Sequence, residues 1–128
     1  MHALEFRIVL NVRFFDLSVC FYRDILGMAS LGGWSGPHSR GARFSVGGGP
    51  VIEIVGAPEG APPFERPTFD SLMFGLRVPD VDALYAQLMA VNVPIVRPPE
   101  DAPGGRRSFA VEDPNGIRIW FYQGMETA

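Results

Sequence analysis

A chain of 128 residues, 47% of them hydrophobic, is long enough to bury a core of its own, yet it holds no apolar run near the roughly 20 residues of a membrane span. The net charge of −3, from 11 basic and 14 acidic residues spread along the chain, argues against nucleic acid or a membrane surface as a partner. All the basic residues are arginines, which excludes a Schiff-base lysine and a phosphate-loop lysine.

The cysteine content and the N-terminal residues bear on the cellular compartment. Cys20 is the single cysteine, so no intrachain disulfide forms and an intracellular setting is favoured. The stretch from Met1 to Arg7 lacks the basic start and the apolar run of a signal peptide. We therefore expect a cytoplasmic protein.

The first half of the chain predicts strands around one helix. Apolar residues at 6, 8, 10 and 12 alternate with the residues between them, which is typical of a half-buried strand. Residues Ser18–Leu26 follow the helical period, with Ser18 as the predicted N-cap and Gly27 as the predicted C-terminal cap. Further strands are expected at Met28–Trp34, Ala42–Val46 and Val51–Val55, the last two joined by a turn at 47–50.

The second half repeats this order after a connection rich in Pro and Gly at 56–70. A strand at 72–78 is followed by a helix at 81–91, with Asp80 as its N-cap and Asn92 in the place that Gly27 takes in the first half. A second Pro/Gly stretch at 98–105 is predicted to be a loop. Short strands are expected at 93–96, 107–111 and 117–122, the last two joined by the turn at 113–116.

The two halves therefore predict a degenerate βαβββ repeat. Val12 corresponds to Val78, Phe44 to Phe109 and Ile52 to Ile119, and a longer turn in the second half accounts for the unequal offsets. The predicted fold class is α+β, with a first module at about 4–55, a linker at 56–70 and a second module at about 71–123.

Four segments, in this order, resemble the vicinal-oxygen-chelate superfamily, which includes glyoxalases, bleomycin resistance proteins and extradiol dioxygenases. Ser18–Gly27 (SVCFYRDILG) resembles the S-x-x-F-Y-x-x-x-L-G first helix of that family. Val51–Ile54 looks like its fourth strand, and Phe74–Ala83 looks like its fifth strand and second helix. Phe109–Gly116, which contains Asp-Pro-Asn-Gly, resembles its hairpin. The resemblance covers nearly the whole chain and implies one domain, 1–128, with two modules whose sheets curl around a cavity.

The resemblance also implies four strand positions that hold a divalent cation in the enzymes of the family. They correspond here to Arg7, Glu53, Met73 and Trp120. Of these, Glu53 alone can coordinate such a cation, because a guanidinium has no lone pair to offer, a thioether is a poor ligand for hard cations and an indole offers none. We expect no metal and no other cofactor, and we expect Arg7 to pair with Glu53 in place of the metal charge.

Strand alternation predicts the side chains that face the cavity. The apolar side of each strand should pack against the helices, so the residues between should face the other way. We expect the following residues to bind a small-molecule ligand: Arg7, Asn11, Arg43, Glu53, Met73, Arg77, Trp120 and Tyr122. Such a wall suits a molecule that is partly aromatic. The simpler alternatives are that Trp120 and Met73 are core residues and that the arginines lie at exposed strand ends.

Three functions remain open at this point. The leading hypothesis is a homodimeric protein that binds a small, partly aromatic molecule without a metal, as in drug or metabolite sequestration. The second is a lyase, isomerase or dioxygenase of the same fold, which recruits a cation through Glu53 or uses Glu53, the only candidate catalytic residue, as a general base with Arg7 stabilising an enolate-like charge. The third is a structural or interaction module whose cavity is filled by its own side chains.

Overall fold

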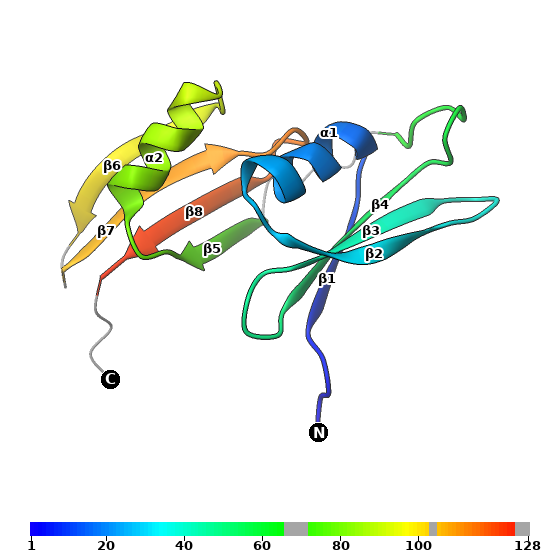
Figure 1. Cartoon of the computed structure of the whole chain (residues 1–128), viewed down its shortest axis with the longest axis horizontal. Helices are drawn as coiled ribbons and strands as arrows, with labels where there is room; N and C mark the ends of the chain where they lie inside the picture. The colour runs from blue at the N-terminus through cyan, green and yellow to red at the C-terminus, as the bar shows by residue number, and fades with distance from the viewer. Residues whose placement is uncertain (66–71, 103–104, 125–128) are drawn as a thin grey trace. The chain divides into compact units, whose positions relative to one another are not determined.

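The computed structural model describes residues 1–65, 72–102 and 105–124 of the chain. The chain divides into two compact units, Met1–Thr68 and Phe69–Ala128, which we call the first and the second module (Figure 1). Each module contains one four-stranded mixed sheet and one helical segment. In the described residues, no helix has both the length and the apolar character needed to cross a membrane.

The first module builds its sheet in the order β1-β4-β3-β2. Strands β1 and β4 pair in parallel, and the other pairs are antiparallel. The elements are β1 (Arg7–Asn11), α1 (Phe15–Val19), the π-helical turn η1 (Cys20–Ile25), β2 (Ala29–Ser35), β3 (Arg40–Ser45) and β4 (Val51–Gly56).

The second module has the corresponding order, β5-β8-β7-β6, again with one parallel pair, β5 and β8. Its elements are β5 (Met73–Arg77), α2 (Val81–Ala90), β6 (Ile95–Ala102), β7 (Arg106–Glu112) and β8 (Arg118–Gln123). Because both modules run βαβββ with the same strand order, the predicted repeat and the α+β fold class are confirmed.

One detail of the predicted repeat is wrong. The last pairs of the two β-hairpins are Ser45–Val51 and Glu112–Arg118, which leave 46–50 and 113–117 between them, so the two turns are equally long. Phe44 faces Ile52, and it is Val111 rather than Phe109 that faces Ile119. A shift of two residues keeps each side chain on the same face, so alternation alone could not detect the error.

The first helix begins earlier than predicted, at Phe15, and Ser18 is not its N-cap. Ser18 is buried inside the helix, where its hydroxyl donates to the carbonyl oxygen of Phe14 one turn back. A serine hydroxyl can bond a carbonyl one turn back within a helix as well as cap the first turn, so Ser18 by itself does not show where the helix begins. The predicted end is confirmed: Gly27 has φ +71°, and the Met28 N–H bonds the Tyr22 carbonyl at 3.0 Å.

Both predicted boundaries of the second helix are confirmed. The Asp80 carboxylate accepts a hydrogen bond from the Ala83 N–H at 3.1 Å, which makes it the N-cap. Asn92 has φ 60°, and the Val93 N–H bonds the Leu88 carbonyl at 3.0 Å. Asn92 therefore closes α2 in the way that Gly27 closes the first helix.

Strand β6 is longer than predicted and contains part of the expected loop. It begins at Ile95, two residues later than the predicted start, and continues through Pro98 and Pro99 to Ala102. Proline lacks an N–H group, but β6 is an edge strand and its pairing with β7 shifts register twice. An edge strand with irregular pairing tolerates proline because one side of it needs no ladder hydrogen bonds.

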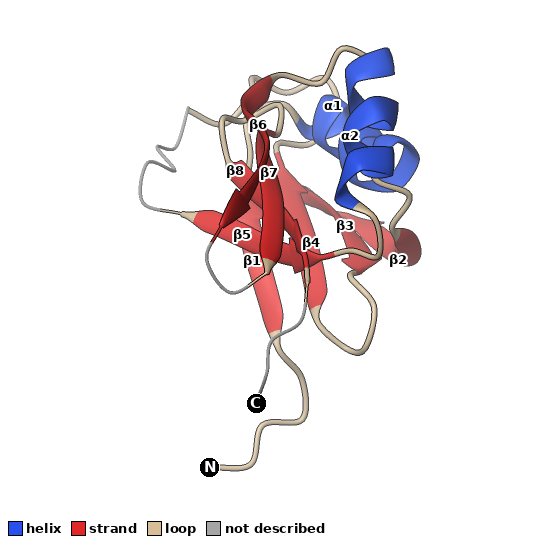
Figure 2. Ribbon diagram, turned by 90° about the vertical axis from the view of Figure 1, so that its left-hand side faces the viewer, coloured by secondary structure: helices blue, strands red, loops and turns tan. Residues whose placement is uncertain are grey.

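Each sheet buries one face against the helical segment of its own module (Figure 2). In the first module, Leu10, Ile54 and Phe44 are at most 2% exposed, and the Phe44 ring stacks near Tyr22 of η1 at 6.5 Å. In the second, Phe109 stacks on Phe121 at 5.1 Å. Phe6 departs from the predicted alternation, since it lies before β1 and is 64% exposed.

Candidate functional site

Glu53 is the centre of a charged cluster on the first module. Register places it between Val9 of β1 and Arg43 of β3, on the face turned away from the helical segment. Its Oε2 atom lies 3.5 Å from Nη1 of Arg7 and 3.7 Å from Nη1 of Arg43. The predicted pairing of Arg7 with Glu53 is therefore present, and Arg43 adds a second guanidinium.

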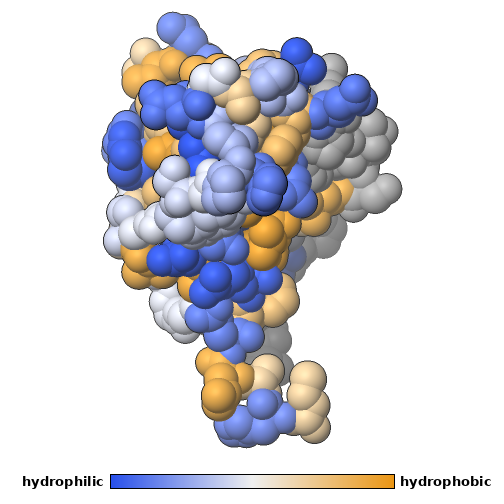
Figure 3. Space-filling view, turned by 90° about the vertical axis from the view of Figure 1, so that its right-hand side faces the viewer, coloured by the Kyte–Doolittle hydropathy of each residue, from blue (hydrophilic) through white to orange (hydrophobic). Residues whose placement is uncertain are grey.

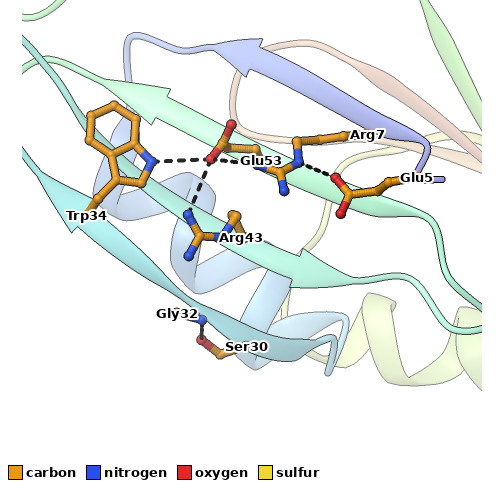
Figure 4. Close-up of polar contacts among 7 residues, drawn as sticks. All are labelled: Glu5, Arg7, Ser30, Gly32, Trp34, Arg43 and Glu53. Carbon is orange, nitrogen blue, oxygen red and sulfur yellow. Dashed lines mark hydrogen bonds and ion pairs between the residues drawn. The ribbon is translucent and has the colours of Figure 1, made fainter. Parts of the chain in front are cut away.

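A residue that the sequence analysis missed completes this cluster. Trp34 of β2 donates its Nε1–H to the same Oε2 atom of Glu53 at 3.2 Å (Figure 4). Trp34 is paired with Gly41 of β3, and a Cβ at position 41 would overlap the indole ring. The sequence feature that could have predicted this contact is the Gly-Pro turn at 36–39. A hairpin closed by that turn brings Trp34 opposite Gly41 and onto the same face of the sheet as Glu53.

Arg7 and Asn11 lie on the same face from strand β1. Arg7 also bonds Glu5 through its Nε at 2.8 Å. That hydrogen bond, with the nearby charge of Glu53, raises the pKa of Arg7 above its ordinary value, so the guanidinium stays protonated. Asn11 is exposed and pairs in register with Val55, one position along the face from Glu53.

The second module carries a pair of stacked aromatic rings on the equivalent face. The centroids of Trp120 and Tyr122 of β8 are 4.6 Å apart, with 23° between the planes. The guanidinium carbon of Arg106 lies 5.3 Å from the Trp120 ring and 4.9 Å from the Tyr122 ring. Gly75 of β5 makes room for this arrangement, because a Cβ there would lie 3.1 Å from the Trp120 ring.

Met73 and Arg77 flank the stacked rings on β5. Met73 is 59% exposed, which contradicts its alternative interpretation as a core residue, and Trp120 is partly exposed. Arg77 is exposed and pairs in register with Tyr122. The four predicted residues of the second module thus share one face of its sheet, as do the four of the first module. That the two sets line one cavity stays a prediction.

The donor set at the positions implied by the family does not fit a divalent cation. Arg7 offers no lone pair and places its positive charge against Glu53, the carboxylate that would have to coordinate the ion. Among residues 1–65, 72–102 and 105–124, no three His, Cys, Asp or Glu side chains gather as a metal site would require. We therefore derive no catalytic step through a metal.

The first module also contains a pocket of about 240 Å³ that the sequence analysis did not predict, between the start of α1 and the segment after β4. Arg40 forms part of its wall, with its Nε donating to the Ala57 carbonyl at 2.9 Å and its guanidinium 4.3 Å above the Phe15 ring. These contacts fix Arg40 as a link between β3, α1 and the connection. None of the predicted ligand-binding residues lines this pocket.

Comparison with solved structures identifies relatives across nearly the whole chain. A glyoxalase/bleomycin resistance protein from Streptomyces sp. CB03234 is 25% identical, with a TM-score of 0.70, and the match covers 93% of this chain and 99% of that one. TnmS3, an antibiotic-binding protein from the same organism, is 24% identical, with a TM-score of 0.73 and coverage of 97% and 98%. The trypanothione-dependent glyoxalase I of Leishmania major is 24% identical, with a TM-score of 0.76 and coverage of 95% and 87%.

Comparison with curated proteins gives no significant match. The family model of the Glyoxalase/Bleomycin resistance protein/Dioxygenase superfamily matches residues 6–121. That match spans both modules, and the βαβββ order of each module and the structural relatives agree with it. The chain belongs to the glyoxalase/bleomycin resistance protein/dioxygenase superfamily.

Proposed function

We propose that this protein binds a small, partly aromatic molecule without a metal and that the second module supplies the stacking surface. The observation that carries the proposal is the Trp120–Tyr122 ring pair, held at 4.6 Å on the sheet face opposite α2. A partly exposed aromatic pair of this kind offers a flat apolar surface, and a further ring can extend the stack.

The surroundings of the ring pair support this proposal. Met73 adds an exposed, polarisable side chain beside the rings, and Arg77 adds an exposed positive charge next to Tyr122. Arg106 approaches both rings with its guanidinium. A partly aromatic molecule with polar substituents would match this mixture of apolar and charged groups.

The antibiotic-binding relative TnmS3 supports binding rather than chemistry as the first hypothesis to test. The geometry at Glu53 points the same way, because its Oε2 atom is engaged by two guanidiniums and one indole N–H. A side chain held in this way serves first as an anchor of the first module. The homodimer and the cytoplasmic location expected from the sequence stay predictions.

Stability measurements and calorimetry test the proposed function. Metal-stripped protein would be screened by thermal shift against planar aromatic compounds, from naphthalene derivatives to anthracyclines. A ligand at a hundredfold excess over its dissociation constant adds about 2.7 kcal/mol to the free energy of unfolding, which raises the melting temperature by several degrees. Calorimetric titration of the best compound would then compare wild type, Trp120→Ala and the control Met89→Ala, whose side chain lies exposed on α2.

We expect Trp120→Ala to weaken binding at least about tenfold, the equivalent of about 1.4 kcal/mol, and Met89→Ala to leave it unchanged. Equal affinity in the wild type and Trp120→Ala would remove the observation on which the proposal rests. A metal ion that stabilises the stripped protein, with the effect lost in Glu53→Ala, would instead favour a metal-dependent enzyme.

A further inference from the structure

Trp34 and Glu53 form a second flat surface with a hydrogen-bond acceptor at its side, on the first module. We propose that these two residues recognise a planar, uncharged group carrying an O–H or N–H donor, such as a phenol or an aryl amide. The inference goes beyond the proposed function, because it places a second recognition surface on the first module by itself and names the chemistry of the group that this surface binds.

The orientation of the Trp34 ring is fixed before any ligand arrives. Three atoms of its indole lie close to the position of a Cβ on Gly41, so the ring lies over β3 instead of extending away from the sheet. The Nε1–H bond to Glu53 at 3.2 Å fixes the end of the ring, and the residue is still 39% exposed. Because this flat, exposed ring is already held at two points, little further side-chain entropy is lost when a ligand stacks on it.

The carboxylate of Glu53 keeps an acceptor available beside this ring. The contacts from Arg7, Arg43 and Trp34 all meet at Oε2, as the dashed lines in Figure 4 show. In the described part of the chain no residue hydrogen-bonds Oε1 of Glu53. An ionised carboxylate has about four acceptor positions, so Oε1 can receive a donor from a ligand.

The charges around Glu53 select a neutral donor. An ammonium group at Oε1 would be attracted by Glu53 but repelled by the guanidiniums of Arg7 and Arg43, both within 4 Å of the same carboxylate. An anionic group would be attracted by the two guanidiniums, but it would be repelled by Glu53 and, as a deprotonated oxygen, would have no hydrogen to donate to Oε1. An uncharged O–H or N–H group gains the hydrogen bond to a charged acceptor without either penalty.

A similar arrangement of tryptophan and glycine in the second module supports a functional role for the one in the first module. The chain contains two tryptophans, Trp34 and Trp120, and each lies over a glycine of the neighbouring strand, Gly41 and Gly75 respectively. The two come from strands that do not correspond in the repeat, since β2 corresponds to β6 and β8 corresponds to β4. Duplication of one ancestral module therefore does not explain the shared feature. The face of the molecule drawn in Figure 3 mixes hydrophilic and hydrophobic residues.

The test uses the two indole N–H signals in a two-dimensional ¹H–¹⁵N NMR spectrum of the full chain. Trp34→Phe and Trp120→Phe assign the signals, because each variant removes one of them. The probes are 1-naphthol, which carries a donor, 1-methoxynaphthalene, which has lost it, and 1-naphthylmethylammonium, which is charged. Calorimetry measures the affinity of each probe for wild type, for Glu53→Gln and for the control Glu59→Gln, an exposed acid after β4.

We expect 1-naphthol to shift the Trp34 signal and to bind at least about tenfold more tightly than either of the other probes. In Glu53→Gln that preference should fall to about threefold or less, since the charged acceptor is gone, and Glu59→Gln should keep it. The unliganded Glu53→Gln variant should also show a moved Trp34 signal and an unmoved Trp120 signal, which verifies the bond without any ligand.

The outcomes separate this inference from the proposed function. If the probes shift only the Trp120 signal, with equal affinities for 1-naphthol and 1-methoxynaphthalene, aromatic binding stands and the role of Trp34 and Glu53 is overturned. If no probe shifts either signal and no planar compound stabilises the protein, the proposed function fails and this inference fails with it.

Discussion

Trp34 lies across Gly41 of the neighbouring strand, and this placement brings its indole N–H to Glu53. A glycine is required at position 41 because a larger residue would occupy the space of the ring, not because of its backbone angles. The cluster around Glu53 therefore depends on a residue that takes no part in its hydrogen bonds.

Gly41→Ala should displace the Trp34 ring and destabilise the protein. The added methyl group overlaps the indole, so the ring must move away, and loss of its hydrogen bond to Glu53 costs about 0.5–1.5 kcal/mol of the free energy of unfolding. Urea denaturation measures the loss, and the Trp34 indole signal should move. The control is Gly36→Ala, where the new Cβ would lie 3.4 Å from its nearest neighbour and where we expect a change below about 0.5 kcal/mol. Equal stabilities of the two variants would show that the ring accommodates the methyl group.

Glu53→Gln should destabilise the first module because two guanidiniums lose their shared counter-charge. The Glu53 side chain is 12% exposed, and an unpaired group at such a position costs about 1–3 kcal/mol. Chemical denaturation of the variant beside Glu59→Gln measures the effect. In the double variant Arg43→Met/Glu53→Gln, the loss in free energy of unfolding should be smaller than the sum of the losses in the single variants Arg43→Met and Glu53→Gln, because the two partners are coupled. Strict additivity would mean that the 3.7 Å contact contributes nothing.

The pair of Asp82 and Arg107 predicts a pH dependence of stability. Arg107 of β7 hydrogen-bonds Asp82 of α2 at 2.9 Å and 3.0 Å, and this lowers the pKa of Asp82 below its ordinary value. A lowered folded-state pKa adds stability that is fully present above the unfolded value of about 3.9 and disappears as the pH falls through the folded value.

The free energy of unfolding of wild type should thus exceed that of Asp82→Asn by a constant amount between pH 7 and about pH 5, and the gap should close below about pH 4. Denaturation curves at a series of pH values test this, and added salt should shrink the gap because the pair is exposed. A gap that widens towards low pH would contradict the assigned sign.

Asp80→Ala should weaken the start of α2. Its carboxylate satisfies the Ala83 N–H, and loss of such a cap costs about 1 kcal/mol. Asp80→Asn should recover most of that loss because asparagine caps nearly as well. Thermal denaturation of the two variants compares them directly, and equal losses would show that the carboxylate acts through something other than the cap.

The sequence predicted the elements best where the physical signal is local. Asp80, Gly27 and Asn92 act within one turn of their own positions, so their roles could be inferred from residue type and spacing. Ser18 failed as a cap because its hydroxyl has two competing partners, the start of a helix and a carbonyl one turn back. The path of β6 through Pro98 and Pro99 could not be predicted without knowing that β6 lies at the edge of its sheet.

For the candidate site, the features that depend on a single strand could be predicted from the sequence, and the contacts between strands could not. Alternation within each strand was enough to place Arg7, Arg43 and Glu53 on one face, because a strand turns successive side chains to opposite sides. By itself the sequence determined the repeat, the family and the faces of the strands. Only the tertiary structure decided that Trp34 reaches Glu53, that Gly41 leaves room for it and that the Arg106 guanidinium approaches the rings of Trp120 and Tyr122. The reason is physical: these contacts join different strands, and their distances depend on the register between strands and on the space left by neighbouring side chains, which alternation along one strand does not encode.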